Sequence, residues 1–168
     1  MSHIKTRRSV RAYKSEPVPS KGLDAVLEAG TCAPTGGGHQ SPIIIAITDP
    51  EYRRKIVKLN AEVMVCTTDP YYGAPVVILV LVDGSATTYV EDGSCALENM
   101  MLAAHALGLG TIWIHREREI FDSESGKDLL WEWKLPEILR GIEAIALGYP
   151  AQEAGKPSAH KQNYIVRI

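Results

Sequence analysis

The chain has 168 residues, of which 45% are hydrophobic and 23% are charged, and its formal net charge at pH 7 is -2. A chain of this size and composition is expected to form one domain over residues 1–168 with a sizeable core, and disorder is excluded by the apolar content. The longest apolar run, Ala74–Val82, has nine residues. A membrane-spanning helix needs about 20, so no membrane association is expected.

The cysteines and the N-terminal residues bear on the compartment. Cys32, Cys66 and Cys95 are widely spaced and form neither a CxxC motif nor a disulfide framework. The chain does not start with a charged segment followed by an apolar one, so no secretory signal is expected. These features together favour a reducing environment, and we expect a cytoplasmic protein.

Charge is distributed unevenly along the chain. Residues 1–14 carry five basic side chains and no acid, and residues 154–168 carry three basic side chains, again with no acid. The segment between them holds 10 basic and 20 acidic residues. Such an acidic body does not suit nucleic-acid binding, which needs a broad basic face. The two basic ends suit one compact anion, such as a phosphate, or are simply solvated.

The first half of the chain predicts two helices and one strand. A helix is expected over residues 20–29, ended by Gly30. Residues 33–40 are too rich in glycine for a regular element and form a loop, and residues 42–48 (PIIIAIT) indicate a buried strand. The next helix, over residues 49–63, begins with Asp-Pro-Glu, which combines a capping carboxylate, a proline in the first turn and an acid.

The second half continues the alternation of strands and helices. After a loop at residues 66–74, strands are expected at residues 75–82, 111–115, 142–147 and, as a last element, 164–168. Helices are expected at residues 88–107, ended by Gly108, and at residues 118–134. The pattern predicts an α/β or α+β protein with a central sheet covered by helices, and it does not fix which strands run parallel.

The segment Arg7–Arg11 (RRSVR) is the first candidate binding site along the chain. Three guanidinium groups and a hydroxyl within five residues can surround a phosphate, because the donors of Arg match its oxygen atoms. A solvated basic start or a targeting peptide would give the same composition. The loop at residues 33–40 offers a second candidate, since glycine lets the backbone approach a phosphate or a planar ligand closely, although a flexible connection would also explain it.

Other site types fit the sequence poorly. Gly108–Gly110 precedes a strand, whereas the dinucleotide-binding fingerprint follows a strand and opens a helix, so a Rossmann site is not expected. The histidines form no metal-binding pattern, and no GxSxG motif is present. Cys95 and His105 lie in an apolar helix, where we expect a buried inert thiol and a core histidine. We therefore predict neither a metal site nor a catalytic acid, base or nucleophile.

Four segments, taken in order, resemble the flavin-dependent nitroreductase family, and most closely its short members. Arg7–Tyr13 (RRSVRAY) is similar to the family's opening RRSxRx[FY], and Ala33–Gln40 (APTGGGHQ) is similar to APSGxNxQ. Ala106–Ile114 (ALGLGTIWI) is similar to the GLGTxW segment, and Leu147–Pro150 matches LGYP. The resemblance therefore covers nearly the whole chain.

The resemblance implies an α+β, three-layer fold of nitroreductase type, in which helices flank a central mixed, mainly antiparallel sheet. It also implies an intertwined homodimer with a non-covalently bound FMN at the subunit interface, the glycine-rich loop coming from the other subunit. The arginines and the basic tail would hold the phosphate, and the segment at 114–115 would pass the flavin ring. The implied cofactor-binding residues are Arg7, Arg8, Ser9, Arg11, Pro34, Thr35, Gly36, Gly38, Gln40, Ile114, His115, His160 and Lys161.

The function implied by the resemblance is an FMN-dependent oxidoreductase. NAD(P)H would reduce the flavin and leave, and a nitroaromatic, quinone or similar small acceptor would then take its place in a ping-pong cycle. Arg11 is the candidate cation for stabilising the reduced ring. Because the cofactor carries the chemistry, no catalytic side chain is needed. Gly38 stands where the family often has asparagine, and the tail lacks the usual Lys-Pro-Arg. A flavin-binding protein for storage or sensing and a member of divergent chemistry therefore remain alternatives.

Overall fold

The computed structural model describes residues 2–153 and 155–168. In chain order the elements are α1 (Ser2–Thr6), α2 (Ser20–Thr31), a 3-10 turn η1 (Gly36–Gly38), β1 (Pro42–Ile47), α3 (Pro50–Met64), β2 (Val76–Asp83), α4 (Tyr89–Ala106), β3 (Gly110–Ile114), α5 (Glu117–Phe121), α6 (Glu124–Glu132) and β4 (Leu139–Gly148). Most of the expected elements are confirmed within a few residues at each end. No helix in the described part of the chain has the length and hydropathy of a membrane span.

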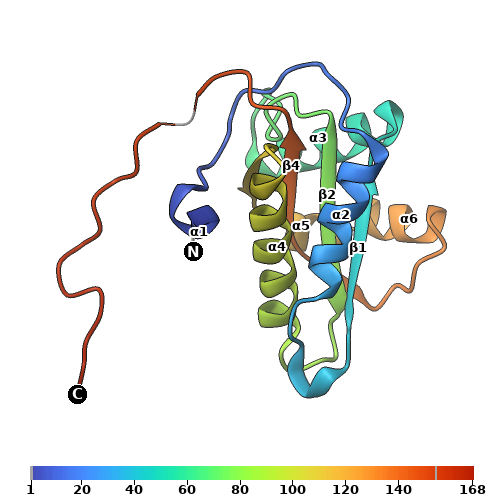
Figure 1. Ribbon diagram of the computed structural model, residues 1–168. Coiled ribbons are helices and arrows are strands. Elements are labelled where there is room, and N and C mark those ends of the chain that lie inside the picture. The colour runs from blue at the N-terminus through green and yellow to red at the C-terminus, as the bar shows by residue number, and fades with distance from the viewer. Residues whose placement is uncertain (1, 154) are drawn as a thin grey trace.

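The four strands form one sheet in the order β1-β2-β4-β3, and every neighbouring pair is antiparallel. Helices α2 and α4 cover one face, and α3, α5 and α6 cover the other (Figure 1). The mainly antiparallel three-layer arrangement is therefore confirmed. One isolated parallel bridge joins Ser9 to Thr111 beside the edge strand β3.

Strand β2 lies in the middle of this arrangement and is buried on both faces. Val77, Leu79 and Leu81 pack in the core beneath α3 and α5, whereas Val76 and Ile78 pack in the core beneath α2 and α4. A strand with no solvent-facing side needs an unbroken apolar sequence, which explains the run that marked this strand in the sequence.

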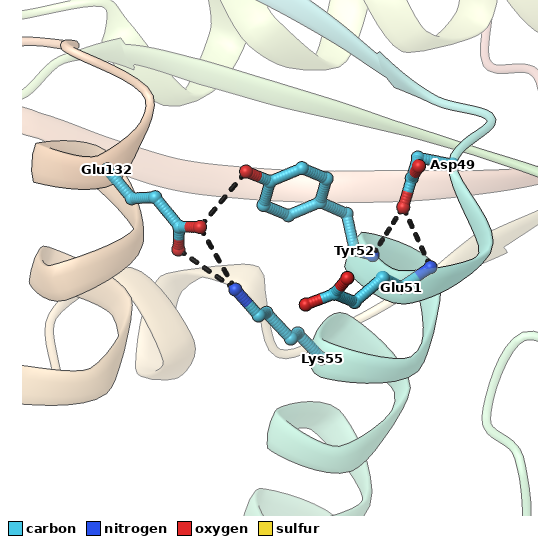
Figure 2. Close-up of polar contacts among 5 residues, drawn as sticks. All are labelled: Asp49, Glu51, Tyr52, Lys55 and Glu132. Carbon is cyan, nitrogen blue, oxygen red and sulfur yellow. Dashed lines mark hydrogen bonds and ion pairs between the residues drawn. The ribbon is translucent and has the colours of Figure 1, made fainter.

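Helix α3 begins as its sequence predicts and is tied to α6. The Asp49 carboxylate accepts hydrogen bonds from the backbone N–H groups of Glu51 (2.7 Å) and Tyr52 (3.1 Å) (Figure 2). One turn further on, Glu132 of α6 accepts hydrogen bonds from the Tyr52 hydroxyl and the Lys55 ammonium, each at 3.0 Å. The contact is solvent-exposed, so it adds little to the stability of the fold.

Two expected elements are wrong. The helix expected over residues 118–134 is two helices, because Ser123 ends α5 and starts α6, its hydroxyl accepting the Gly126 N–H at 3.2 Å. The strand expected at 164–168 is absent from the structure of the described residues. Those residues belong to an exposed extended tail that leaves the body after β4 (Figure 1), where no neighbouring strand offers a partner. Cys95 is also exposed on α4 rather than buried.

Candidate functional site

Arg7 and Arg8 line a cavity of about 190 Å³ beside the start of β3. Its other walls come from His105, near the end of α4, from the turn into β3, and from the connection after β4. These lining residues are Val10, His105, Gly108, Leu109, Gly110, Thr111 and Pro150. The cavity brings the first basic segment together with the GLGT segment, two motifs about 100 residues apart.

Backbone contacts fix the N-terminal segment against the sheet at this point. The Val10 N–H donates to the Thr111 carbonyl at 2.9 Å, next to the bridge between Ser9 and Thr111. Gly110 allows this approach, because a Cβ atom there would lie 2.7 Å from a methyl group of Val10. The glycine of the motif is thus explained by a close approach of chain to chain.

The two arginines differ in what they already bind. Nη1 of Arg8 donates to the backbone carbonyls of Lys5 (2.9 Å) and Arg7 (2.6 Å). The guanidinium of Arg7 donates no hydrogen bond to any other residue that the structure describes. Arg7 therefore offers more unused donors to an anion, and Arg8 combines a positive charge with support of the turn before it.

His105 lies at the rim of this cavity and not in the core, which corrects the expectation from the sequence. Its Nε2 is 2.7 Å from the Thr6 hydroxyl, and its ring meets the His3 ring edge to face. Partial burial lowers its pKa, and the nearby His3 and the two arginines lower it further. Burial is the larger cause, and the smaller contribution of His3 and the arginines reflects the positive charge gathered at this cavity.

The hydroxyl of Thr111 is buried and has no hydrogen-bond partner among the described residues, although Thr111 lines the same cavity. A buried polar group without a partner is uncommon and costs stability unless a ligand or water satisfies it.

The outer edge of β3 extends from this cavity. β3 pairs with β4 on one side only, and in an antiparallel ladder alternate residues turn their backbone groups to opposite sides. The Thr111 carbonyl faces outward to Val10, so the backbone groups of Trp113 face the same open side, and the N–H of His115 follows just beyond the end of the strand. Ile114, between them, is buried in the core and anchors the strand.

The His115 side chain is exposed and paired with a carboxylate. Its Nδ1 lies 2.6 Å from Oε1 of Glu143 on the neighbouring strand β4. Burial raises the pKa of Glu143, and His115 partly opposes that increase. The other carboxylate oxygen of Glu143 is buried and lacks a partner within the described residues.

The glycine-rich loop is held in place by a buried carboxylate that the sequence did not reveal. Asp92 of α4 accepts the N–H of Gly36 (2.9 Å) and the hydroxyls of Ser41 (3.1 Å) and Thr88 (3.3 Å). The N–H of Gln40 also donates to the hydroxyl oxygen of Thr35 at 3.0 Å. The loop is therefore an ordered turn and not merely a flexible connection. In the sequence, Asp92 is an acidic residue in the first turn of a helix, and nothing there indicates its contact with the loop.

Comparison with known proteins agrees with the geometry. The chain matches the Nitroreductase family over residues 4–68 and 65–149. A relative from Methanothermobacter thermautotrophicus, whose name refers to NADH dehydrogenase and NAD(P)H nitroreductase, is 34% identical over 90% of this chain and 78% of its own length. A nitroreductase with bound FMN from Bacteroides fragilis has a TM-score of 0.88 at 29% identity, covering 99% of this chain and 97% of that one.

The chain belongs to the nitroreductase family. A third relative, the FMN reductase [NAD(P)H] of Bacillus subtilis, is 26% identical over 89% of this chain and 65% of its own length. The resemblance found in the four sequence motifs is thereby confirmed.

The residues that line the arginine cavity fit the phosphate end of FMN. Arg7 and Arg8 supply donors suited to a phosphate, and the neighbouring β3 edge is open to a flat group. Pockets that enclose a whole drug-sized ligand have volumes of about 300–1,000 Å³. A cavity of about 190 Å³ therefore suits one end of the nucleotide and leaves the ring outside it.

Other site residues predicted from the sequence lie elsewhere in the protomer. Arg11 is exposed beyond the cavity, and Pro34 and Gly38 are on the loop near the start of α4. His160 and Lys161 lie in the exposed tail, where both contact the ring of Tyr164. The single chain thus brings Arg7 and Arg8 together at one cavity and leaves the loop and the tail apart from it.

Proposed function

We propose that the protein is an FMN-dependent oxidoreductase that takes hydride from NAD(P)H and passes it to a small acceptor such as a nitroaromatic or a quinone. The observation that carries this proposal is the cavity lined by Arg7 and Arg8, beside the open edge of β3. It is supported by the nitroreductase of Bacteroides fragilis with bound FMN and by the Bacillus subtilis FMN reductase.

The proposed roles of this chain's own groups are binding and orientation. FMN supplies the hydride chemistry when bound. Arg7 and Arg8 hold the phosphate end through charge-assisted hydrogen bonds, each worth about 1.5–3 kcal/mol. The backbone N–H groups of Trp113 and His115 are placed to bond polar atoms of the ring, and Arg11 would balance negative charge on it.

We further propose that two copies of the chain complete each site. The loop at 34–40 is fixed to Asp92 near the start of α4, whereas His105, near its end, lines the arginine cavity. The thirteen residues from Asp92 to His105 span about 20 Å of helix. A loop at one end and a phosphate site at the other come together most simply when the loop belongs to a partner protomer.

The surface of α4 supports this dimer. Exposed or half-exposed side chains recur at helical spacing along one face of this helix, among them Glu91, Cys95, Glu98, Leu102 and Ala106. The tail offers further apolar surface, since Tyr164, Ile165 and Val166 are each more than two-thirds exposed. A second copy would cover both. The free cysteines, Cys32, Cys66 and Cys95, are compatible with the cytoplasmic location that we also propose.

The decisive experiment is an absorbance spectrum of the purified, FMN-loaded protein, recorded before and after anaerobic NADH and then NADPH. Flavin bands that bleach with either nucleotide and return with a quinone are the expected result, and the faster donor is the physiological candidate. A protein that takes up no FMN would contradict the proposed site. A yellow protein that neither nucleotide bleaches would instead support the alternative of a flavin-binding protein for storage or sensing.

A further inference from the structure

The turn between β3 and α5 has an unusual backbone. Arg116 lies in the left-handed region, with φ of 91° and ψ of 5°, and it separates the open β3 edge from the first residue of α5. A long side chain rarely adopts this conformation, which is maintained only where the surroundings determine it. Something outside the turn must therefore hold it.

Asn60 of α3 contacts both residues of this turn. Its Nδ2 donates to the His115 carbonyl at 2.9 Å, and its Oδ1 accepts from Nε of Arg116 at 2.8 Å. Asn60 itself is fully buried. One amide side chain thus binds the backbone on one side of the turn and the side chain on the other.

A buried cluster fixes the amide of Asn60 in turn. Nδ2 lies 3.2 Å from Oε2 of Glu117 and 3.1 Å from the hydroxyl of Tyr71, and that hydroxyl donates to Oε1 of Glu117 at 2.6 Å. Glu117 and Tyr71 are both fully buried. A closed polar network of this kind is costly to bury, and it fixes one arrangement of its members.

We propose that Asn60 is a positioning residue of the flavin site, acting through the His115–Arg116 turn. By holding the His115 carbonyl and the Arg116 guanidinium, it fixes the direction in which the end of β3 presents its backbone N–H groups. This inference rests on the proposed function, because it concerns the same β3 edge. Hydrogen bonds to the ring tune the properties of a bound flavin, so a displaced turn alters both affinity and reduction potential.

The competing interpretation is that Asn60 only anchors α3 in the core. Three variants separate the two. Asn60→Ala removes both contacts with the turn, and Arg116→Ala removes only the contact between Arg116 and Asn60. Because the Arg116 side chain is half-buried, this variant is expected to fold even if Asn60→Ala does not. Tyr71→Phe removes a hydroxyl from the same cluster and leaves both contacts with the turn in place. Arg118→Ala is the matched control for charge, since this exposed arginine lies two residues further on and has no bond to Asn60.

The measurements are FMN affinity by fluorescence quenching, the flavin midpoint potential, and amide hydrogen exchange at residues 115–117 in the apoprotein. We expect Asn60→Ala and Arg116→Ala to weaken FMN binding by about 2- to 12-fold, as for the loss of one positioning hydrogen bond, to shift the potential, and to speed exchange in the turn. Arg118→Ala should leave affinity and potential near those of the wild type, and Tyr71→Phe should change them less than Asn60→Ala does, because both contacts with the turn remain.

The two possible failures are distinguishable. A wild-type protein that binds no FMN would refute the proposed function, and the inference would fail with it. A wild-type protein that binds FMN, with Asn60→Ala and Arg116→Ala variants of unchanged affinity, potential and exchange, would overturn the positioning role alone. That role would also be overturned if Tyr71→Phe weakened FMN binding as much as Asn60→Ala does at equal loss of stability.

Discussion

The Tyr71 hydroxyl donates a 2.6 Å hydrogen bond to the carboxyl group of Glu117, and both side chains are fully buried. Burial raises the pKa of Glu117 well above its usual value, while the bond from Tyr71 acts in the opposite direction. Burial also raises the pKa of Tyr71, and the negative charge of Glu117 adds to that increase. The pair is therefore most stable in the folded protein when the carboxyl group is protonated.

Glu117 should make the free energy of unfolding depend on pH. Its pKa is higher in the folded chain than in the unfolded one, so its contribution to stability is complete below the unfolded value of 4.5 and is lost as pH rises through the folded value. Glu117→Gln removes this titration. Chemical denaturation between pH 4.5 and 9 should show the variant gaining stability relative to the wild type as pH increases. Parallel curves would contradict the prediction.

Removing either arginine of the cavity should weaken FMN binding. Arg8→Ala should lower FMN affinity by about 1.5–3 kcal/mol, because one charge-assisted interaction with the phosphate is lost. Arg7→Ala should have a similar effect without loosening the turn that Arg8 supports. Titration calorimetry measures both, and Arg54→Ala, an exposed arginine on α3, controls for net charge. Unchanged affinity in the double Arg7→Ala/Arg8→Ala variant would refute the phosphate assignment.

Asp92 should matter for stability as well as for the loop. Asp92→Ala leaves the Gly36 N–H and two hydroxyls without their acceptor, at a cost of about 1–3 kcal/mol. Asp92→Asn keeps one acceptor oxygen and should lose less. Urea denaturation of both variants tests the order of stabilities, and equal stability of the alanine variant and the wild type would mean that the loop orders itself without Asp92.

Gly141 on β4 lies against the backbone of α5. A Cβ atom there would lie 2.1 Å from the Glu117 carbonyl oxygen, so Gly141→Ala should displace α5 and cost about 1–3 kcal/mol. Gly22 in α2 has open space around the same position, and Gly22→Ala should instead add about 0.5–1 kcal/mol. Thermal unfolding of the two variants should therefore shift in opposite directions. A neutral Gly141→Ala would show that α5 is free to move.

Removing the C-terminal tail should affect dimer formation without affecting the folding of the protomer. Residues 155–168 are exposed throughout, so a variant that lacks them should keep the secondary structure and the protomer core. If the tail completes a partner's site, the same variant should dissociate more readily and bind FMN more weakly. Circular dichroism, sedimentation velocity and FMN titration distinguish these effects. A truncated protein that remains dimeric with full FMN affinity would refute the proposed role of the tail.

The sequence predicted correctly those features of the fold that depend on neighbouring residues. The Asp49 cap, the glycine at 108 with φ of 74° and the apolar run of β2 each depend on near neighbours or on one periodicity. The break at Ser123 was missed because helical propensity continues across it. The sequence at 164–168 has the composition of a strand, but composition cannot supply a neighbour to pair with. That residues 1–168 form one domain stays a prediction.

In the candidate site, too, the residues of a local motif were predicted and those with distant partners were missed. Arg7 and Arg8 could be predicted from a motif, and their cavity is made by elements that the sequence also predicts. Asp92, Asn60 and Glu117 were missed because most of their partners lie 46 to 57 residues away in the sequence. A buried polar group reveals its purpose only through such partners. The polar Asn60 inside a helix was the one available signal.

The hold of Asp92 on the glycine-rich loop also has a consequence for conformational entropy. Fixing the backbone of one residue costs about 1–2 kcal/mol, and glycine loses more freedom than any other residue. Here the bonds from Gly36 and Ser41 to Asp92 join groups of one chain, so this entropy is lost when the protomer folds. A ligand that meets the loop afterwards binds a preformed surface, and its affinity is not reduced by the ordering of three consecutive glycines.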